Sequence, residues 1–587
     1  MFMGVVMANE SVEYTLTVTD ANQHLAQVEI RLPILEAEQI ELKLPVWRTG
    51  RYEILDLSKN ISEFSVENSS AEALLWRKSD KNTWLVDNTT ASGVTVRYTV
   101  YANMLKQRVA HIDDTHAFID ASGVFMFSPE LRQQPLTVQL AVPGQWRSRS
   151  GMESIGEHQF KAKNYDQLVD SPIESGIHEF LEFTVADRLY EIIIWGRGNH
   201  DILKLKEAID KIDQVAADLW QDFPFNRYVY MFHVGEGLRG ATEHVNSTII
   251  QQGRFNFAPR QDLLKVLATT AHEFIHTWNV KSYRPAGIAP YDYSKENYSS
   301  LYWMVEGSTS YYDDLFLLRA GIYKPKDYFE RLAQGIQAHL NKPGRLISSV
   351  AASSFDTWLN NDRQFSHNNS VSIYLEGALK SWALDREIRA RSQFKYSYDD
   401  VQRQLYQRFG GSQVGYTVQD VLAIVESLTD EDIGDFWADY IEGTKELDFN
   451  ELLAFYGLEK VIDEESKTDN WLGLSMTSGS MGPEVANVNR DSPAWQAGLT
   501  VGDELLALDG LRVSVEHFDD YLQQLQAGQS YPLVFFRGEQ IKTINITPVI
   551  NPNPNFTIRP LAKPSRNQVR VFKDWTGRSL SSVSDES

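Results

Sequence analysis

The chain has 587 residues, of which 42% are hydrophobic and 23% are charged, and its formal net charge is −23. This length exceeds what a single hydrophobic core supports, so we expect three or four domains. The composition excludes a largely disordered chain. The acidic balance excludes a nucleic-acid partner, because phosphate binding needs clustered Lys and Arg. Since the chain has no cysteine, it forms no disulfide, and any metal is held by His, Asp or Glu.

The first residues, MFMGVVMANE, contain a short apolar run without a basic segment before it, which predicts no signal peptide. No run of about 18 apolar residues occurs, so we expect no membrane span. A cytoplasmic location is the expectation that follows, with the periplasm as the alternative if the chain starts elsewhere.

Residues 1–186 contain short alternating runs broken by Asn, Asp, Gly and Pro. This pattern predicts an N-terminal β-sandwich-like domain that walls one side of a cleft. His111 and His116, with Asp113 and Asp114 between them, invite a metal assignment. They fall in a predicted loop, and the sequence interpretation assigns them no metal.

Residues 187–458 change to strands followed by long helices, an order typical of a thermolysin-like α/β catalytic domain with a helical portion. A strand that precedes the central helix is expected to edge the cleft and to pair with a peptide backbone. Three histidines in this region lack ligand spacing and are predicted to be structural or surface residues: His233, His244 and His367. Later helices are predicted at 326–342, 371–392 and 417–428.

The central helix is predicted from Gln261 to Asn279, because its apolar residues recur at spacings of three and four. His272 and His276 are four residues apart, so they project from one face with Cβ atoms about 6 Å apart and can share one zinc ion. Glu273 then faces the metal-bound water as its general base, as in other HExxH sites. The alternative is that these histidines are ordinary core residues.

A second apolar-periodic helix spans residues 301–318 and carries Glu306 in its first turns. Its apolar neighbours predict that the carboxylate is buried, and a buried carboxylate is costly unless it is paired or binds a metal. Glu306 is therefore the predicted third ligand. The alternative is a helix N-terminal acid stabilised by the helix dipole.

After a charged linker predicted at 459–470, residues 468–550 resemble a PDZ domain of the bacterial type. The resemblance implies that a loop of four residues offers backbone N–H groups to a peptide C-terminus, while the peptide adds as a strand. These residues are Trp471, Leu472, Gly473 and Leu474. Such a domain can instead dock on its own catalytic domain.

The remaining residues, 551–587, are predicted to be a tail whose end is disordered. Within it, the segment RVFKDWTG at 570–577 is apolar enough to pack on the body of the protein.

Three further segments match a known family in order: PVWRTGRY at 45–52, WNVKSYRP at 278–285 and WMVEGSTSYY at 303–312. With the histidines and Glu306 they resemble the gluzincin metallopeptidases, specifically the glycyl aminopeptidase family that carries a PDZ domain. The aminopeptidase N family is a more distant relative. The resemblance implies one zinc ion per chain, held by His272, His276 and Glu306.

Residues 240–244, GATEH, resemble the exopeptidase strand of this family. The resemblance implies that Gly240 and Glu243 bind substrate, with the carboxylate of Glu243 on the free α-amino group. Thr242 departs from the usual apolar residue, and a turn residue is the alternative role for Glu243.

Tyr374 resembles the tyrosine of the aminopeptidase N motif YEKG, whose hydroxyl stabilises the oxyanion. Glu376 stands where that motif has lysine. Tyr311 and Tyr312 are competing candidates for this role, and Tyr374 can also be an ordinary helix residue.

These motifs predict a multidomain α+β zinc aminopeptidase that acts on peptides with a free N-terminus. The resemblance implies a preference for N-terminal Gly and Ala. The alternatives are a zinc endopeptidase, an aminopeptidase of broad specificity, or a PDZ-bearing adaptor with an inactive peptidase domain.

Overall fold

The computed structural model describes residues 11–89, 92–359, 362–480 and 482–581. The expected absence of a signal peptide and the disordered chain end concern residues outside these ranges. The chain forms two compact units: the first contains residues 1–299 and 402–417, and the second contains residues 300–401 and 418–587.

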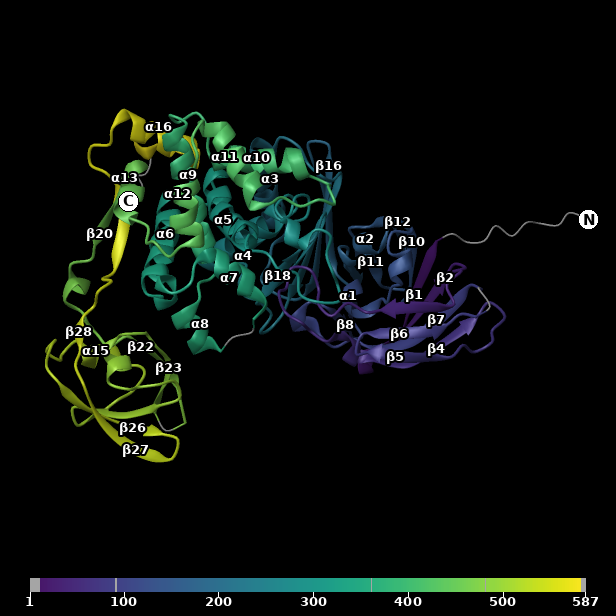
Figure 1. Cartoon of the computed structure of the whole chain (residues 1–587), viewed down its shortest axis with the longest axis horizontal. Coiled ribbons are helices and arrows are strands. Elements are labelled where there is room, and N and C mark those ends of the chain that lie inside the picture. The colour runs from purple at the N-terminus through teal and green to yellow at the C-terminus, as the bar shows by residue number, and fades with distance from the viewer. Residues whose placement is uncertain (1–10, 90–91, 360–361, 481, 582–587) are drawn as a thin grey trace, which may run out of the picture. The chain divides into compact units, whose positions relative to one another are not determined.

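The N-terminal part of the first unit is rich in β-structure, as the alternating runs predict (Figure 1). In β1 (Val12–Asp20), for example, Val12, Tyr14 and Leu16 are buried and the residues between them are half-buried. A seven-stranded sheet has the order β12-β13-β10-β1-β2-β7-β4. Its other strands are β2 (Leu25–Leu32), β4 (Ile61–Asn68), β7 (Val94–Tyr101), β10 (Leu136–Ala141), β12 (Glu153–Gly156) and β13 (Gln159–Ala162).

Two smaller sheets complete this β-rich part. One has the order β3-β6-β5 and the other β11-β14-β9-β8. The strands are β3 (Gln39–Lys43), β5 (Trp76–Asp80), β6 (Thr83–Asp87), β8 (Ala110–Ile112), β9 (His116–Ile119), β11 (Arg147–Ser150) and β14 (Ile173–Gly176).

A five-stranded sheet of order β15-β16-β17-β19-β18 follows. Its three central strands run parallel, and the two outer strands are antiparallel to their neighbours. The strands are β15 (Glu179–Val185), β16 (Arg188–Gly196), β17 (Arg227–Val234), β18 (Gly240–Glu243) and β19 (Ser247–Gln252). β18 therefore lies at the edge of the sheet.

Two helices accompany this sheet in the sequence. α3 (Ile202–Trp220) starts at Asp201, whose carboxylate accepts the backbone N–H groups of Leu203 and Lys204. α4 (Arg260–Ile275) is the predicted central helix and contacts β18 and β19. It ends four residues before Asn279, because the N–H groups of Thr277 and Trp278 bond three residues back and tighten the last turn.

The second unit begins with helices. A π-helical turn (η6, Trp303–Gly307) leads into α5 (Ser308–Arg319). The later helices confirm the sequence prediction with small shifts of their ends: α6 (Pro325–Leu340), α9 (Leu375–Arg391) and α11 (Val418–Thr429). α8 (Arg363–Asn369) and α13 (Phe449–Phe455) are shorter additions. Within the part of the chain that the structure describes, no helix has the length and apolar character to cross a bilayer.

The PDZ domain has its own core, which includes Val485, Leu505, Leu508, Leu533 and Phe535. Its sheet has the order β22-β23-β24-β26-β27. The strands are β22 (Leu474–Ser478), β23 (Pro483–Val488), β24 (Glu504–Leu508), β26 (Tyr531–Arg537) and β27 (Gln540–Ile546). β22, which follows the predicted carboxylate loop, is an edge strand.

The segments before and after the PDZ domain differ from the predicted linker and tail. β20 (Leu458–Ile462) begins where the linker was predicted and pairs antiparallel with β29 (Phe556–Pro560). Glu459 and Lys460 made this segment look like a linker, but backbone pairing forms a strand despite its low hydrophobicity. The segment from 570 to 577 packs on the body as predicted, within α16 (Arg566–Thr576).

Trp575 is the largest anchor of α16. Its indole N–H donates to Tyr311 Oη at 2.9 Å, and its ring is fully buried near Trp382 and Tyr456.

We predict that Trp575→Ala lowers the stability of the second unit by about 3–5 kcal/mol, the usual cost of removing a buried aromatic side chain. Scanning calorimetry and limited proteolysis of the full chain measure the change. Val569→Ala on the same helix is the control, because Val569 is 39% exposed. Equal melting temperatures for the two variants would show that α16 does not stabilise the unit.

Candidate active site

The predicted metal-binding histidines lie at the C-terminal end of α4. Their ring centroids are 4.7 Å apart, as a spacing of four on a helix requires. His276 is buried, whereas His272 is half-buried. The two imidazoles are therefore close enough to share a cation.

The ring of His276 is held in one tautomer. Its Nδ1 lies 2.7 Å from the carbonyl oxygen of Asn279, so Nδ1 carries the proton and donates it to that oxygen. Nε2 is then the unprotonated nitrogen that a metal needs. The turn that ends α4 early brings this carbonyl under the ring, and the sequence did not predict this contact.

Buried carboxylates lie next to this histidine. Ligand atoms of Glu243, Glu273 and His276 all lie within 4.8 Å of one another, and all three residues are buried. Glu243 ends the edge strand β18 and Glu273 lies on α4. The first unit thus brings together the predicted amine-binding carboxylate, the predicted general base and a predicted metal ligand.

Gly50 makes room for the carboxylate of Glu243. A Cβ atom on Gly50 would lie 2.3 Å from Glu243 Oε2, and the φ angle of Gly50 is +74°, a conformation that side chains disfavour. Gly50 belongs to the segment PVWRTGRY that matched the family. The close approach of Gly50 to Glu243 shows that this segment lies beside the predicted site residues.

Lys281 supplies the balancing positive charge. Its buried ammonium lies 2.7 Å from Asp170 and 3.9 Å from Glu243. Burial alone would lower the pKa of Lys281, but the charges of Asp170 and Glu243, with the nearby Tyr291, raise it above its ordinary value. The pKa of Asp170 moves down because Lys281 and His244 outweigh the effect of burial. Both groups of the pair therefore stay ionised.

Gly240, the other predicted substrate-binding residue, is exposed at the start of β18. Its φ angle is +100°, and a Cβ atom there would lie 2.6 Å from the guanidinium of Arg108. Arg108 in turn donates to Thr242 Oγ1 at 3.0 Å. Thr242, the departure from the family pattern, is thus a hydrogen-bond acceptor that ties the strand to Arg108.

Glu306 lies in the second unit, within η6, and is buried as predicted. π-Helical turns are rare and often occur at functional sites. Next to it, Gly307 meets Gly377 of α9 so closely that a Cβ atom on Gly307 would lie 2.3 Å from the Gly377 Cα. This crossing of two backbones fixes Glu306 relative to α9 within the unit.

Tyr374 precedes α9 and is 42% exposed. The competing tyrosines are buried, and their hydroxyls are engaged. The hydroxyl of Tyr311 accepts from Trp575, and that of Tyr312 donates to Asp399 at 2.9 Å. Of the three tyrosines, Tyr374 is thus the one with an exposed side chain.

Glu376, the departure from the YEKG motif, has a structural role. It is buried and lies 2.6 Å from His339 Nδ1 and 3.2 Å from Lys380 Nζ. Burial raises the pKa of Glu376, but the hydrogen bond from His339 and the charge of Lys380 outweigh it and lower the pKa from 4.5 to about 2. At the position where the motif has lysine, this chain therefore has a buried glutamate that pairs with Lys380 and His339.

The predicted carboxylate loop is fixed to the turn that follows β23. Leu472 O accepts from Ala494 N at 2.9 Å and Gly473 O accepts from Asn489 N at 2.8 Å. α8 also contacts this end of β23: the amide of Gln364 both donates to and accepts from the backbone of Val488. The PDZ domain therefore docks on a helix of its own unit, one of the two roles expected from the sequence, while β22 keeps an outer edge.

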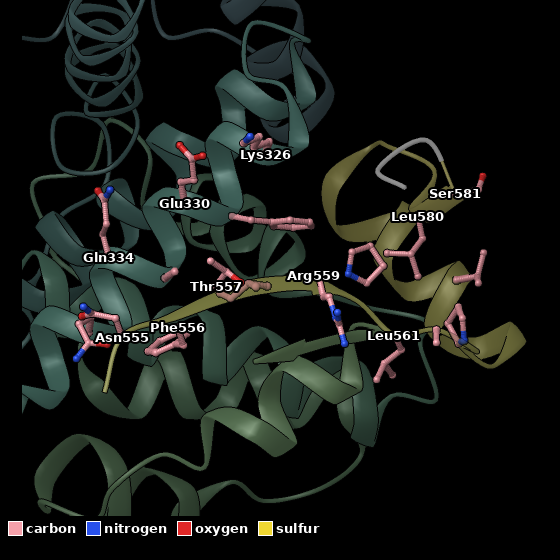
Figure 2. Close-up of a pocket in the computed structure, with 18 residues that line it drawn as sticks. Lys326, Glu330, Gln334, Asn555, Phe556, Thr557, Arg559, Leu561, Leu580 and Ser581 are labelled. Carbon is pink, nitrogen blue, oxygen red and sulfur yellow. The ribbon is translucent and has the colours of Figure 1, made fainter. Parts of the chain in front are cut away.

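Figure 2 shows a cavity of about 910 Å³ in the second unit. It is lined by α6, β29 and the region of α16, with Phe329, Phe556 and Leu561 among its apolar side chains. None of the predicted site residues lines it. This cavity is therefore separate from the residues predicted on α4 and β18.

We predict that Glu376→Gln lowers the melting temperature at neutral pH. A folded pKa of about 2 against 4.5 means that the charge stabilises the fold above pH 4.5 by about 3 kcal/mol. This contribution is lost as the pH falls from 4.5 toward 2. Calorimetry of both proteins over this range should show the difference shrinking, and a difference that is constant with pH would contradict the ion pair. Glu451→Gln is the control, because that side chain is 65% exposed.

Comparison with known proteins gives three family matches. Residues 13–177 match the peptidase M61 N-terminal domain, residues 265–380 match the M61 glycyl aminopeptidase, and residues 484–535 match a PDZ domain. The second match covers α4, Glu306 and Tyr374.

Among solved structures, an aminopeptidase N family protein from Idiomarina loihiensis is 27% identical, with a TM-score of 0.89 over 96% of this chain and 100% of that chain. An M1 zinc metallopeptidase from Deinococcus radiodurans is 13% identical, with a TM-score of 0.48 over 75% of this chain and 94% of that chain.

A Clostridium perfringens protein named as a zinc metalloprotease is 34% identical over 83 residues, which are 14% of this chain and only 24% of that protein. The family matches extend over both the β-rich part and the region of α4. The chain therefore carries regions that match the N-terminal and catalytic domains of the M61 glycyl aminopeptidases, together with a PDZ domain.

Proposed function

We propose that this chain is a zinc-dependent aminopeptidase that removes N-terminal residues from peptides, with a preference for Gly and Ala. The observation that supports it best is the group formed by Glu243, Glu273 and His276 in the first unit. In this group the carboxylate proposed to bind the amine lies close to the proposed general base and to a proposed metal ligand. The preference for small residues is supported by the description of the family as glycyl aminopeptidases.

His272, His276 and Glu306 are the proposed zinc ligands. Two imidazoles and a carboxylate are a donor set that suits zinc in catalytic sites, and the contact of His276 Nδ1 with Asn279 O makes Nε2 the nitrogen that would bind the ion. When bound, zinc acts as a Lewis acid that acidifies water and polarises the scissile carbonyl. Glu306 supports this assignment by being buried in a π-helical turn.

In the proposed mechanism Glu273 accepts the proton of the attacking water and passes it to the leaving amine. Tyr374 donates its hydroxyl proton in a hydrogen bond to the oxygen of the scissile carbonyl as negative charge develops there. The outer edge of β18 offers backbone groups to the peptide, which adds as a further strand.

Glu243 restricts cleavage to the first peptide bond. Its buried carboxylate pairs with the α-ammonium of the substrate, and a charged hydrogen bond of this kind is strong in a buried site. Lys281 already pairs with Asp170, which leaves Glu243 at the longer distance of 3.9 Å. A second ammonium, that of the substrate, can therefore approach Glu243.

We predict that Glu273→Gln lowers kcat for Gly- and Ala-arylamides by about 10²–10⁴-fold, the usual contribution of a general base. The control is Asp262→Asn on the same helix, whose side chain is 42% exposed. Chelation should abolish the activity of the control variant, and added zinc should restore it. Added zinc should not raise the activity of Glu273→Gln to the level of the control. Full activity of the Gln variant would exclude Glu273 as the base.

We also predict that Glu243→Gln lowers kcat/KM for free dipeptide amides by more than 10-fold, because the ion pair with the amine is lost. Wild-type protein should not cleave the same peptides after N-acetylation. If acetylated peptides are cleaved as fast as free ones, the chain is an endopeptidase. If zinc-loaded, folded protein cleaves neither, the adaptor function gains support.

For the PDZ domain we propose that a peptide C-terminus binds at Trp471, Leu472, Gly473 and Leu474. The edge position of β22, directly after this loop, supports addition of the peptide as a strand.

A further inference from the structure

We infer that the first unit contains a second divalent-cation site, formed by His111, Asp113 and His116, that takes a zinc-class ion such as Zn²⁺ or Co²⁺. It lies on the hairpin of β8 and β9 and shares no residue with the proposed catalytic centre. The inference does not depend on the proposed peptidase function.

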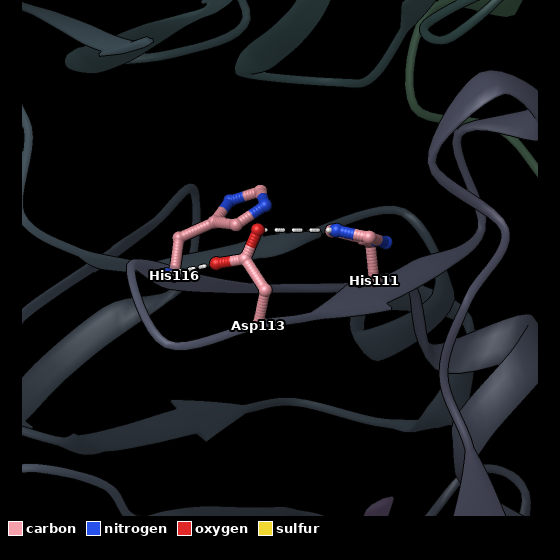
Figure 3. A group of neighbouring side chains, drawn as sticks. All are labelled: His111, Asp113 and His116. Atoms are coloured by element: carbon pink, nitrogen blue, oxygen red, sulfur yellow. Dashed lines mark hydrogen bonds and ion pairs between the residues drawn. The ribbon is translucent and has the colours of Figure 1, made fainter. Parts of the chain in front are cut away.

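The three side chains converge on one point. One ligand atom from each residue lies within 4.8 Å of those from the other two. Figure 3 shows the carboxylate of Asp113 between the two imidazoles, with His111 and His116 on opposite sides of it. His111 Nε2 lies 3.4 Å from Asp113 Oδ2. Two ligand atoms that are each about 2.1 Å from a tetrahedral zinc ion lie about 3.4 Å apart, so this spacing suits a shared metal.

His116 is oriented as a metal ligand. Its Nδ1 lies 2.9 Å from Glu174 Oε1, and both residues are fully buried. Because Nδ1 donates its proton to the carboxylate, Nε2 carries a lone pair. Among the residues that the structure describes, this buried Nε2 has no hydrogen-bond partner. A histidine held by a carboxylate on one nitrogen and open on the other is the usual arrangement at protein metal sites.

The carboxylate of Glu174, which holds His116, is itself held in place. Glu174 Oε2 lies 2.9 Å from Nε2 of His233, another fully buried histidine. The ring of Trp195 stacks on that of His116, with centroids 3.6 Å apart. Each oxygen of the Glu174 carboxylate is therefore held by a different histidine. His116 thus has a fixed orientation before any ion binds.

One carboxylate oxygen of Asp113 accepts hydrogen bonds within the turn, and the other is the proposed ligand of the ion. Oδ1 accepts from the backbone N–H groups of Thr115 and His116 and from the Thr115 hydroxyl, at 2.6–3.0 Å. Oδ2 faces His111. The turn thus uses Oδ1, and Oδ2 is the oxygen on the side of the histidine.

An ion can reach this site. The side chain of Asp113 is 27% exposed, and His111 lines a cavity of about 680 Å³ together with Trp195 and Glu236. Three protein ligands leave a fourth tetrahedral position for water. The sequence interpretation rejected a metal here because it placed both histidines in a loop. They lie instead on paired strands with buried rings, and the pairing brings them to the same carboxylate.

The test counts metal on the full chain. Chelator-treated protein is dialysed against increasing Zn²⁺, and bound zinc per chain is measured. We expect two zinc ions per chain for wild type, one for Asp113→Asn and two for Asp114→Asn. Asp113→Asn keeps the side-chain oxygen that accepts the hydrogen bonds of the turn and removes the negative charge of the proposed ligand. Asp114 is an exposed neighbour outside the group. His272→Gln should independently remove the other zinc and leave this one.

Two further measurements keep the result independent of folding. Glu174→Gln should weaken zinc binding at this site by 10–100-fold, as for other carboxylates behind a metal-bound histidine. With Co²⁺, the visible absorption that remains in His272→Gln should disappear in His272→Gln with Asp113→Asn. The inference is overturned if His272→Gln binds no zinc, or if Asp113→Asn and Asp114→Asn bind the same number of ions. His111 and Asp113 would then form only an ion pair.

Discussion

Two carboxylates that share a buried region set the main constraint on this structure. Glu243 and Glu273 lie within 4.8 Å of one another and of His276, and buried negative charges are costly unless positive partners are present. Within the unit, Lys281 provides part of the compensation, and Asp170 holds Lys281 in place. The remaining need for positive charge is what a metal and a substrate ammonium can supply.

This constraint explains why segments far apart in the sequence meet here. Gly50 gives the Glu243 carboxylate its space, Asn279 fixes the tautomer of His276, and the edge strand β18 carries Glu243. Each of these acts through backbone geometry as much as through a side chain. A substitution at Gly50 would disturb the site without removing any group that takes part in the chemistry.

The sequence predicted the parts of the site that depend on periodicity. The pairing of His272 with His276 follows from helix spacing, and the burial of Glu306 follows from its apolar neighbours. Contacts between distant segments were not predictable in this way, including Gly50 with Glu243 and Glu376 with His339. The hairpin at His111 and His116 was predicted to be a loop, because its strands have only three and four residues and two aspartates stand between them. β20 was missed because its stability comes from pairing with β29, nearly a hundred residues later.

The pairing of β20 with β29 has a consequence for the modular construction of the chain. The PDZ domain leaves the helical body at one strand and returns at the adjacent antiparallel strand, and the bonds from Asp463 to Asn555 and from Asn551 to Asp469 bring the two connections together. In topological terms the domain is an insertion into a β-hairpin rather than an appendage at the chain end. A short turn that joins β20 directly to β29 would excise it and keep α16 attached. Evolution can therefore gain, lose or exchange this module without rebuilding the helical core around it.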